Sequence, residues 1–275
     1  MLSKILSAES ENFIKLAFGD TKYLESSKFI YSINLFSQCP SNDVLKVIIK
    51  NEFTPSLPID YKAFSFLRCF CDIYVTSGES VRKQNNDGTQ SKPEFLGFKD
   101  WEQLFKQTPN QKINYILSQK FDKETLFQMN AIKASHQKTI ITTNPQLEEE
   151  IKKDLSLQNF IGQYQIQFTP SMDNLQQAIN YLLRSYPEQR VLIELGVSTV
   201  KQALYQTDPA TQPLDLLVLS IYQGLLDEEF VGQDHPNLQF FKQYFDLVHT
   251  SEKFEAHKGF VQFFIFKKKH SNNYS

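Results

Sequence analysis

The chain has 275 residues, of which 41% are hydrophobic and 13% aromatic, and its 29 basic residues nearly balance 31 acidic ones. This composition is typical of a folded protein with a substantial core, and it excludes a disordered or fibrous chain. The net charge of −2 provides no global positive field, so we do not expect direct nucleic acid binding. No apolar run reaches the roughly 18 residues needed to span a bilayer, so no membrane association is expected.

The three cysteines, Cys39, Cys69 and Cys71, do not form the pattern of a disulfide framework. Their odd number favours a reducing compartment, so we expect the protein in the cytoplasm, with the nucleus as the alternative. The five histidines are scattered without metal-ligand spacing, and no metal site is predicted. The phosphate-binding, nucleophile-elbow and zinc-protease motifs are absent from the sequence.

The first part of the chain alternates between helical and extended patterns. Residues Met1–Phe18 predict an additional N-terminal helix, and the apolar run Lys28–Leu35 predicts a strand. The apolar residues of Asn42–Asn51 fit a largely buried helix. Cys69–Thr76 is then typical of a second strand. A strand that leads into a helix through a short polar turn begins a βαβ unit.

Later segments predict first a hairpin and then a series of helices. Lys112–Ser118 and residues 121–127 predict two short strands joined by a turn, with a helix from Met129. Prolines separate five further segments that we interpret as helices: Pro145–Gln165, Ser171–Tyr186, Gln189–Tyr205, Pro213–Leu226 and Pro236–His249. Phe260–Phe266 predicts a closing strand.

This order predicts a fold of two parts, an α/β half followed by an all-α half. We expect an N-terminal extension over residues 1–27 and a thioredoxin-like domain over 28–140, with an insertion at 53–93. An all-helical domain with a short C-terminal strand is expected over residues 141–275.

Four stretches resemble landmarks of the cytosolic glutathione transferases. Ile30–Ile49 is similar to that family's first strand, catalytic turn and following helix, and Pro93–Leu117 resembles the stretch ending in its N-P-x-G-K-V-P-x-L motif. Glu124–Ile132 resembles its E-S-N-A-I motif, and Pro236–Gly259 resembles a later helix of the family. The resemblance implies a thioredoxin-like half followed by the family's all-helical C-terminal domain.

Departures from this family's pattern fall on the residues that contact glutathione. Asn114 stands where the family has a cis-proline, and Gln128-Met129 replaces the Glu-Ser pair that binds the γ-glutamyl group. Asp215 keeps the acidic residue of the family's buried capping box. The resemblance therefore implies a degenerate glutathione site made of Asn114, Gln128 and Met129, and no bound cofactor.

From the resemblance we expect a non-catalytic scaffold in a multi-protein complex, as in the gamma subunit of elongation factor one B and in proteins attached to aminoacyl-tRNA synthetases. A translation or tRNA setting follows by analogy, as does a homo- or heterodimer. An aromatic helical stripe and a basic run are candidates for partner binding, although core packing and a solvated tail are the simpler interpretations: Phe240, Phe241, Tyr244, Lys267, Lys268 and Lys269.

Three alternatives remain open at this stage. Cys39 follows a predicted strand and precedes a predicted helix, where its thiol pKa can be lowered, so a glutathione-dependent transferase or thiol reductase is one alternative. An accessory subunit of a nucleic-acid-modifying enzyme is a second. The third is an unrelated α/β domain whose likeness to the glutathione transferases is coincidental.

Overall fold

The computed structural model describes the greater part of the chain. The described residues are 6–38, 45–48, 58–81, 101, 112–118, 122–128, 138–142, 144–170, 172, 175–196, 199, 204, 213–224, 231–235 and 238–269. Among them, no helix has both the length and the apolar character needed to cross a membrane.

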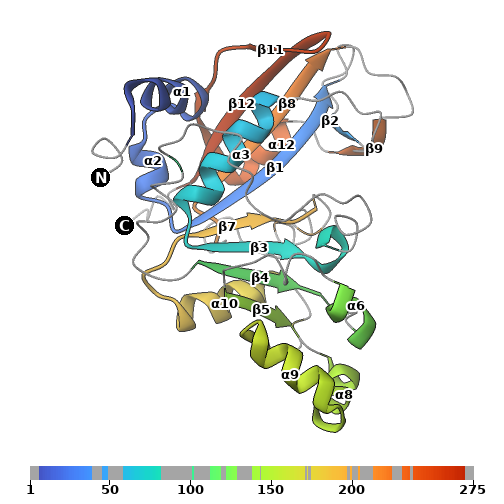
Figure 1. Cartoon of the computed structure of the whole chain (residues 1–275). Helices are drawn as coiled ribbons and strands as arrows, with labels where there is room; N and C mark the ends of the chain where they lie inside the picture. Colours follow the sequence, from blue (N-terminus) through green and yellow to red (C-terminus); the bar gives the residue numbers. More distant parts are fainter. Residues whose placement is uncertain are drawn as a thin grey trace.

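Helices and strands are interspersed along both halves of the described chain (Figure 1). The helices are α1 (Ala8–Phe18), α2 (Lys22–Glu25), α3 (Pro58–Phe70), α6 (Lys123–Gln128), α8 (Pro145–Lys153), α9 (Leu155–Gln163), α10 (Leu175–Ser185) and α12 (Leu238–Tyr244). The strands are β1 (Phe29–Gln38), β2 (Leu45–Ile48), β3 (Ile73–Ser77), β4 (Ile113–Leu117), β5 (Lys138–Thr142), β6 (Ile166–Thr169), β7 (Val191–Glu194), β8 (Leu216–Gly224), β9 (Val231–His235), β10 (Phe245–Thr250), β11 (Phe254–Ala256) and β12 (Gly259–Lys268).

Within the described residues these strands form one mixed, twelve-stranded sheet. Its main path runs in the order β10-β12-β8-β1-β7-β3-β4-β5-β6. The seven strands from β8 to β6 are parallel, whereas β12 pairs antiparallel with β8, and β10 pairs antiparallel with β12. Strand β7, late in the sequence, lies between β1 and β3. The central strands are therefore covered on both faces, as their apolar sequences require.

Helices pack on both faces of the sheet. On one face, α10 and α12 bury Ile179 and Phe241 against strand residues such as Ile193. On the opposite face, α1 and α3 bury Phe18 and Phe66 in an aromatic cluster. Figure 1 shows α3 crossing in front of strands β1, β8 and β12. A third cluster joins α6, α8 and α9 to strands β4, β5 and β6.

The prediction of an all-α second half is wrong. Strands β7 and β8 lie within the segments Gln189–Tyr205 and Pro213–Leu226, which were predicted as helices. Both strands are buried on both faces, so their apolar runs are continuous and carry no alternation that would separate a strand from a buried helix. The strands before and after residue 140 thus belong to one sheet, not to a thioredoxin-like unit beside a helical one.

Shorter predictions also change type. The segment Asn42–Asn51 contains strand β2, and residues 121–127 contain helix α6 in place of the second hairpin strand. The long segment Pro236–His249 divides into α12 and β10. By contrast, the N-terminal helix and the strands expected at Lys28–Leu35, Lys112–Ser118 and Phe260–Phe266 are confirmed.

Asp215 has a structural role different from the expected helix cap. One of its carboxylate oxygens accepts hydrogen bonds from the backbone N–H groups of Lys28 and Phe29, each at 2.9 Å. These bonds join the start of β1 to the segment that leads into β8.

Candidate functional site

The sheet has a topological switch point between strands β3 and β7, the position where α/β folds form a ligand crevice, and we call this position the crevice. The chain leaves β3 towards β4, on one side, and leaves β7 towards β8, on the other side. In parallel α/β sheets, ligands bind outside the carboxyl ends of the strands at the point where the connections diverge in this way. Thr76 of β3 pairs with Glu194 of β7, so Ser77, the last residue of β3, and Leu195, the first residue after β7, lie at the same edge of the sheet.

A hydroxyl group stands on the β3 side of the crevice. The Ser77 Oγ accepts a hydrogen bond from the Ser80 backbone N–H at 3.0 Å and lies 2.9 Å from the Ser80 Oγ. Ser77 therefore caps the helical turn that follows β3, as serine does at a helix start.

A glycine stands on the β7 side. No atom of the described residues lies within 4 Å of the position where a Cβ would sit on Gly196. The Gly196 carbonyl accepts a hydrogen bond from the Thr199 N–H at 3.0 Å, which closes a turn directly after the strand. A ligand can therefore approach the backbone of this turn closely, which a side chain would prevent.

A partly buried polar network lies beneath this turn. The Arg68 guanidinium of α3 donates to both carboxylate oxygens of Glu194, at 3.0 and 2.6 Å. The Tyr74 hydroxyl of β3 donates to the same carboxylate at 2.9 Å and accepts from Arg68 at 3.2 Å. Burial opposes the charge on Arg68, but Glu194 and Tyr74 outweigh it and raise the Arg68 pKa. The network joins α3, β3 and β7 through a bidentate pair.

Helix α3 carries a buried carboxyl group in its first turn. Asp60 is fully buried and shares the sheet-facing stripe of α3 with Ala63 and Leu67. The last turn of α3 lies at the amino edge of the sheet, because Lys112, just before β4, donates to the carbonyls of Cys69 and Cys71 there. The first turn of α3, with Asp60, therefore points back to the carboxyl edge.

Two hydroxyl groups lie on the sheet face that α3 covers. Ser32 of β1 and Ser220 of β8 are 3% and 1% exposed, and neither Oγ has a hydrogen-bond partner among the described residues. Each lies two residues after a buried residue, Ile30 or Val218, and therefore faces the same side of the sheet, under α1 and α3. Buried polar groups are nearly always hydrogen-bonded, so these two hydroxyls are candidates to bind a polar ligand or a water molecule.

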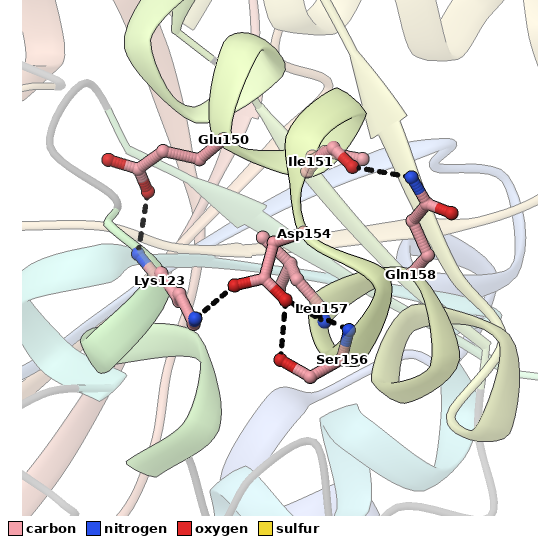
Figure 2. A network of polar contacts seen from close by, with 7 residues as sticks. All are labelled: Lys123, Glu150, Ile151, Asp154, Ser156, Leu157 and Gln158. Carbon is pink, nitrogen blue, oxygen red and sulfur yellow. Dashed lines mark hydrogen bonds and ion pairs between the residues drawn. The ribbon is translucent and has the colours of Figure 1, made fainter.

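A separate hollow of about 550 Å³ lies beside α6, α8 and α9. Figure 2 shows that Lys123 forms an ion pair with Asp154 there. Asp154 also accepts hydrogen bonds from the Ser156 and Leu157 N–H groups, at 2.8 and 3.2 Å, and so caps α9. The charged groups of Lys123 and Asp154 thus stabilise the corner between α8 and α9. We therefore assign this hollow a structural role.

The degenerate glutathione site was expected at residues that the structure does not bring into the crevice. Asn114 is an internal residue of β4, paired with Tyr74 and Thr139, and Gln128 ends helix α6. Met129 and Cys39 lie outside the described residues.

The candidate partner residues occupy two environments. Three of them lie on α12 and are buried in the core beneath it: Phe240, Phe241 and Tyr244. Lys267, Lys268 and Lys269 are half-buried at the end of β12, where the Lys267 ammonium lies 5.8 Å from the Tyr23 ring centroid. Within the parts of the chain that the structure describes, no three His, Cys, Asp or Glu side chains gather in a way that could hold a metal ion.

The other two cysteines lie in the interior. Burial raises the pKa of Cys69 and of Cys71 to about 12, although nearby Lys112 acts in the opposite direction. Both thiols therefore stay protonated near neutral pH and are poor nucleophiles.

The fold is similar to solved structures of reductase-like proteins. A pyrimidine reductase-like protein from Corynebacterium diphtheriae matches with a TM-score of 0.54 and 16% identity, over 94% of this chain and 99% of that chain. Two forms of Acinetobacter baumannii RibD match with TM-scores of 0.52 and 0.51 at 8% and 10% identity, and 62% of the RibD chain is covered. Neither a protein-family model nor a curated protein sequence matches the chain.

These comparisons, together with the sheet topology, correct the sequence-based assignment. The chain does not have a glutathione-transferase-like fold, since its described strands form one mixed sheet and its fold is similar to that of the pyrimidine reductase-like protein over 94% of the chain. The scaffold hypothesis, the Cys39 thiol reductase and the accessory-subunit alternative are withdrawn with it. The scaffold hypothesis depended on a decayed glutathione site in a fold that this chain does not adopt. The Cys39 hypothesis depended on a helix over Asn42–Asn51, and that segment contains strand β2.

The sequence analysis missed Asp60, Ser77, Glu194 and Gly196. A local signal exists at two of them, because Ser77-Gly78 directly follows a predicted strand, and Leu195-Gly196 directly follows the apolar run of β7. Strand followed by a glycine turn is the usual start of a phosphate-binding loop. Predicting Gln189–Tyr205 as a helix concealed the second signal.

Proposed function

We propose that this protein is an NAD(P)H-dependent reductase that acts on a pyrimidine-like heterocycle. The observation that carries the proposal is the switch point of the sheet between β3 and β7, with Ser77 on one side and Gly196 on the other. The likeness to a pyrimidine reductase-like protein over nearly the whole of both chains supports the reaction class and the substrate class.

The residues of the crevice fit a dinucleotide. The open backbone at Gly196 and the hydroxyl of Ser77 would receive its phosphates, because close backbone approach and short donors are what phosphate binding needs. When bound, NAD(P)H supplies the hydride for the reduction.

The substrate would lie under α3, next to the crevice. A heterocycle that accepts a hydride also needs a proton, and Asp60 is the one acidic side chain among the described residues that is fully buried. The Ser32 and Ser220 hydroxyls on the same face would hydrogen-bond the ring's nitrogen and oxygen atoms. Asp60 is therefore the proposed proton donor.

Titration with NADPH and NADH tests the cofactor assignment. We expect nucleotide fluorescence to change on binding to the wild-type protein, and Gly196→Val to weaken binding at least about tenfold because its side chain occupies the open position. Gly162→Val is the matched control, since Gly162 in α9 also has nothing within 4 Å of its Cβ position. Equal effects of the two substitutions, or no binding by the wild type, would reject the assignment.

Asp60→Asn tests the proton donor. We expect this variant to bind NADPH with unchanged affinity but to oxidise it about 10²- to 10⁴-fold more slowly with amino-substituted uracils that the wild type reduces. Undiminished turnover by Asp60→Asn would remove Asp60 from the reaction.

A further inference from the structure

The turn that follows β7 is fixed from both faces of the sheet. On the α3 face, Arg68 and Tyr74 hold the Glu194 carboxylate. On the opposite face, the Tyr31 hydroxyl of β1 donates to the carbonyl of Leu195 at 3.0 Å. Two successive residues, Glu194 and Leu195, are thus held by neighbouring elements on opposite faces of the sheet, immediately before Gly196.

The contact on the α3 face is partly buried and geometrically specific. The Glu194 side chain is 10% exposed and that of Arg68 is 29% exposed. A bidentate pair with a third donor allows the carboxylate one orientation, and Arg68 is itself stacked 4.9 Å from the Tyr74 ring centroid. Because β7 has only four residues, this contact fixes much of the strand.

The contact on the other face is fully buried. Tyr31 has no solvent exposure, and its ring packs in the cluster that also contains Ile193 and Leu195. Burial raises the Tyr31 pKa well above its ordinary value, so its hydroxyl remains a donor throughout the neutral and mildly alkaline range. The Leu195 carbonyl therefore keeps its direction, and the peptide that it shares with Gly196 keeps its plane.

We propose that Tyr31, Arg68 and Tyr74 are positioning residues that hold the Leu195–Gly196 backbone ready for the dinucleotide. This inference rests on the proposed function, because it assigns a purpose to the turn at the same crevice. Binding sites gain affinity when supporting side chains fix the groups that contact the ligand before it arrives. None of the three residues needs to touch the dinucleotide, because each acts through Glu194 or through the Leu195 carbonyl.

Tyr31→Phe and Tyr74→Phe test the inference, because each removes one hydroxyl and keeps the ring. We expect each to raise the Kd for NADPH about three- to tenfold, the effect of losing one hydrogen bond that prepares the turn. The matched control is Tyr115→Phe. Tyr115 is also a fully buried tyrosine, and its hydroxyl lies 3.2 Å from the Thr169 Oγ1 and 3.1 Å from the Met172 sulfur, partners that lie outside β7. Its substitution should leave the Kd unchanged.

Hydrogen exchange of the free protein gives a second readout that needs no nucleotide. We expect the amides of the segment around Gly196, including Thr199, to exchange faster in Tyr31→Phe and Tyr74→Phe than in the wild type or in Tyr115→Phe. If the wild type binds neither NADPH nor NADH, the proposed function fails, while the exchange measurement still decides whether the turn is held. Unchanged exchange in both variants, or an equal rise in Kd for Tyr115→Phe, would overturn the positioning role.

Discussion

Lys112 places an ammonium group inside the protein, under the last turn of α3. It is 7% exposed, and its Nζ donates to the backbone carbonyls of Arg68, Cys69 and Cys71 at 3.3, 2.7 and 2.5 Å. These carbonyls belong to the end of a helix, where a cation is favourable and where backbone acceptors lack partners within the helix. Burial lowers the Lys112 pKa, yet the three acceptors match the three protons of the charged form.

We expect Lys112→Ala to lower the free energy of unfolding by about 2–4 kcal/mol, because buried carbonyls lose their donor. Urea denaturation followed by circular dichroism measures this. Lys153→Ala, whose side chain is 77% exposed, should leave the midpoint almost unchanged. Similar midpoints for the two variants would show that Lys112 does not stabilise the end of α3.

At the scale of residues, the sequence shows which charged side chains are present but does not show which of them are buried or which partners they contact. Lys112 begins a predicted strand that is confirmed, yet nothing in the local pattern indicates that its amine is buried under a helix more than 40 residues earlier in the chain. The same holds for Arg68 and Glu194, which are 126 residues apart and meet only in the folded sheet. Such pairs depend on strand order, which a single sequence does not display.

At the scale of elements, the corner between α8 and α9 shows how a helix boundary is set. The segment Pro145–Gln165 was predicted as one helix, but it contains α8 and α9, divided at Asp154. Asp154 has extended backbone dihedrals and caps α9, while Asn144 caps α8 by accepting from the Leu147 N–H at 2.9 Å. Asp154 thus divides the predicted helix by capping α9, and the hydrophobic periodicity of the segment does not indicate this division.

We expect Asp154→Ala to increase hydrogen exchange at the start of α9, because the Ser156 and Leu157 amides lose their acceptor. Its ion pair with Lys123 and these hydrogen bonds lower the Asp154 pKa below the ordinary 3.8. The stabilisation is therefore present above about pH 4 and is lost as the pH falls below it. Gln146→Ala, on the exposed side of α8, is the control; equal exchange in both variants would contradict the capping role.

The strands β7 and β8 explain why the fold assignment failed. Val191–Glu194 and Leu216–Gly224 are nearly all buried, so they lack the alternation that identifies half-buried strands such as those of hairpins. Their β-branched and aliphatic residues suit a central parallel strand, but a buried helix has a similar composition. The N-terminal helix and β12 were predicted because their patterns are local.

At the scale of the whole molecule, the sheet makes the two halves of the sequence interdependent. Strand β7 lies between β1 and β3, and β8 lies on the other side of β1. A fragment of residues 1–140 would therefore leave β1 and β3 without the strand that joins them, and α3 would lose much of the surface that it covers.

We expect separate fragments 1–140 and 141–275 to remain unfolded, and the whole chain to unfold in one cooperative transition. Circular dichroism and amide dispersion in NMR spectra of each fragment measure this. A fragment with dispersed amide signals and its own cooperative melting would contradict the single-sheet account and would support the two domains expected from the sequence.

The central claim is that a nicotinamide dinucleotide binds at the carboxyl edge between β3 and β7. Hydrogen exchange measured by mass spectrometry, with and without saturating NADPH, tests it most directly. The account predicts protection concentrated in the peptides around Ser77 and Gly196, with no change at the α8–α9 corner. Protection confined to other segments, or no protection at a nucleotide concentration that saturates binding, would contradict the claim.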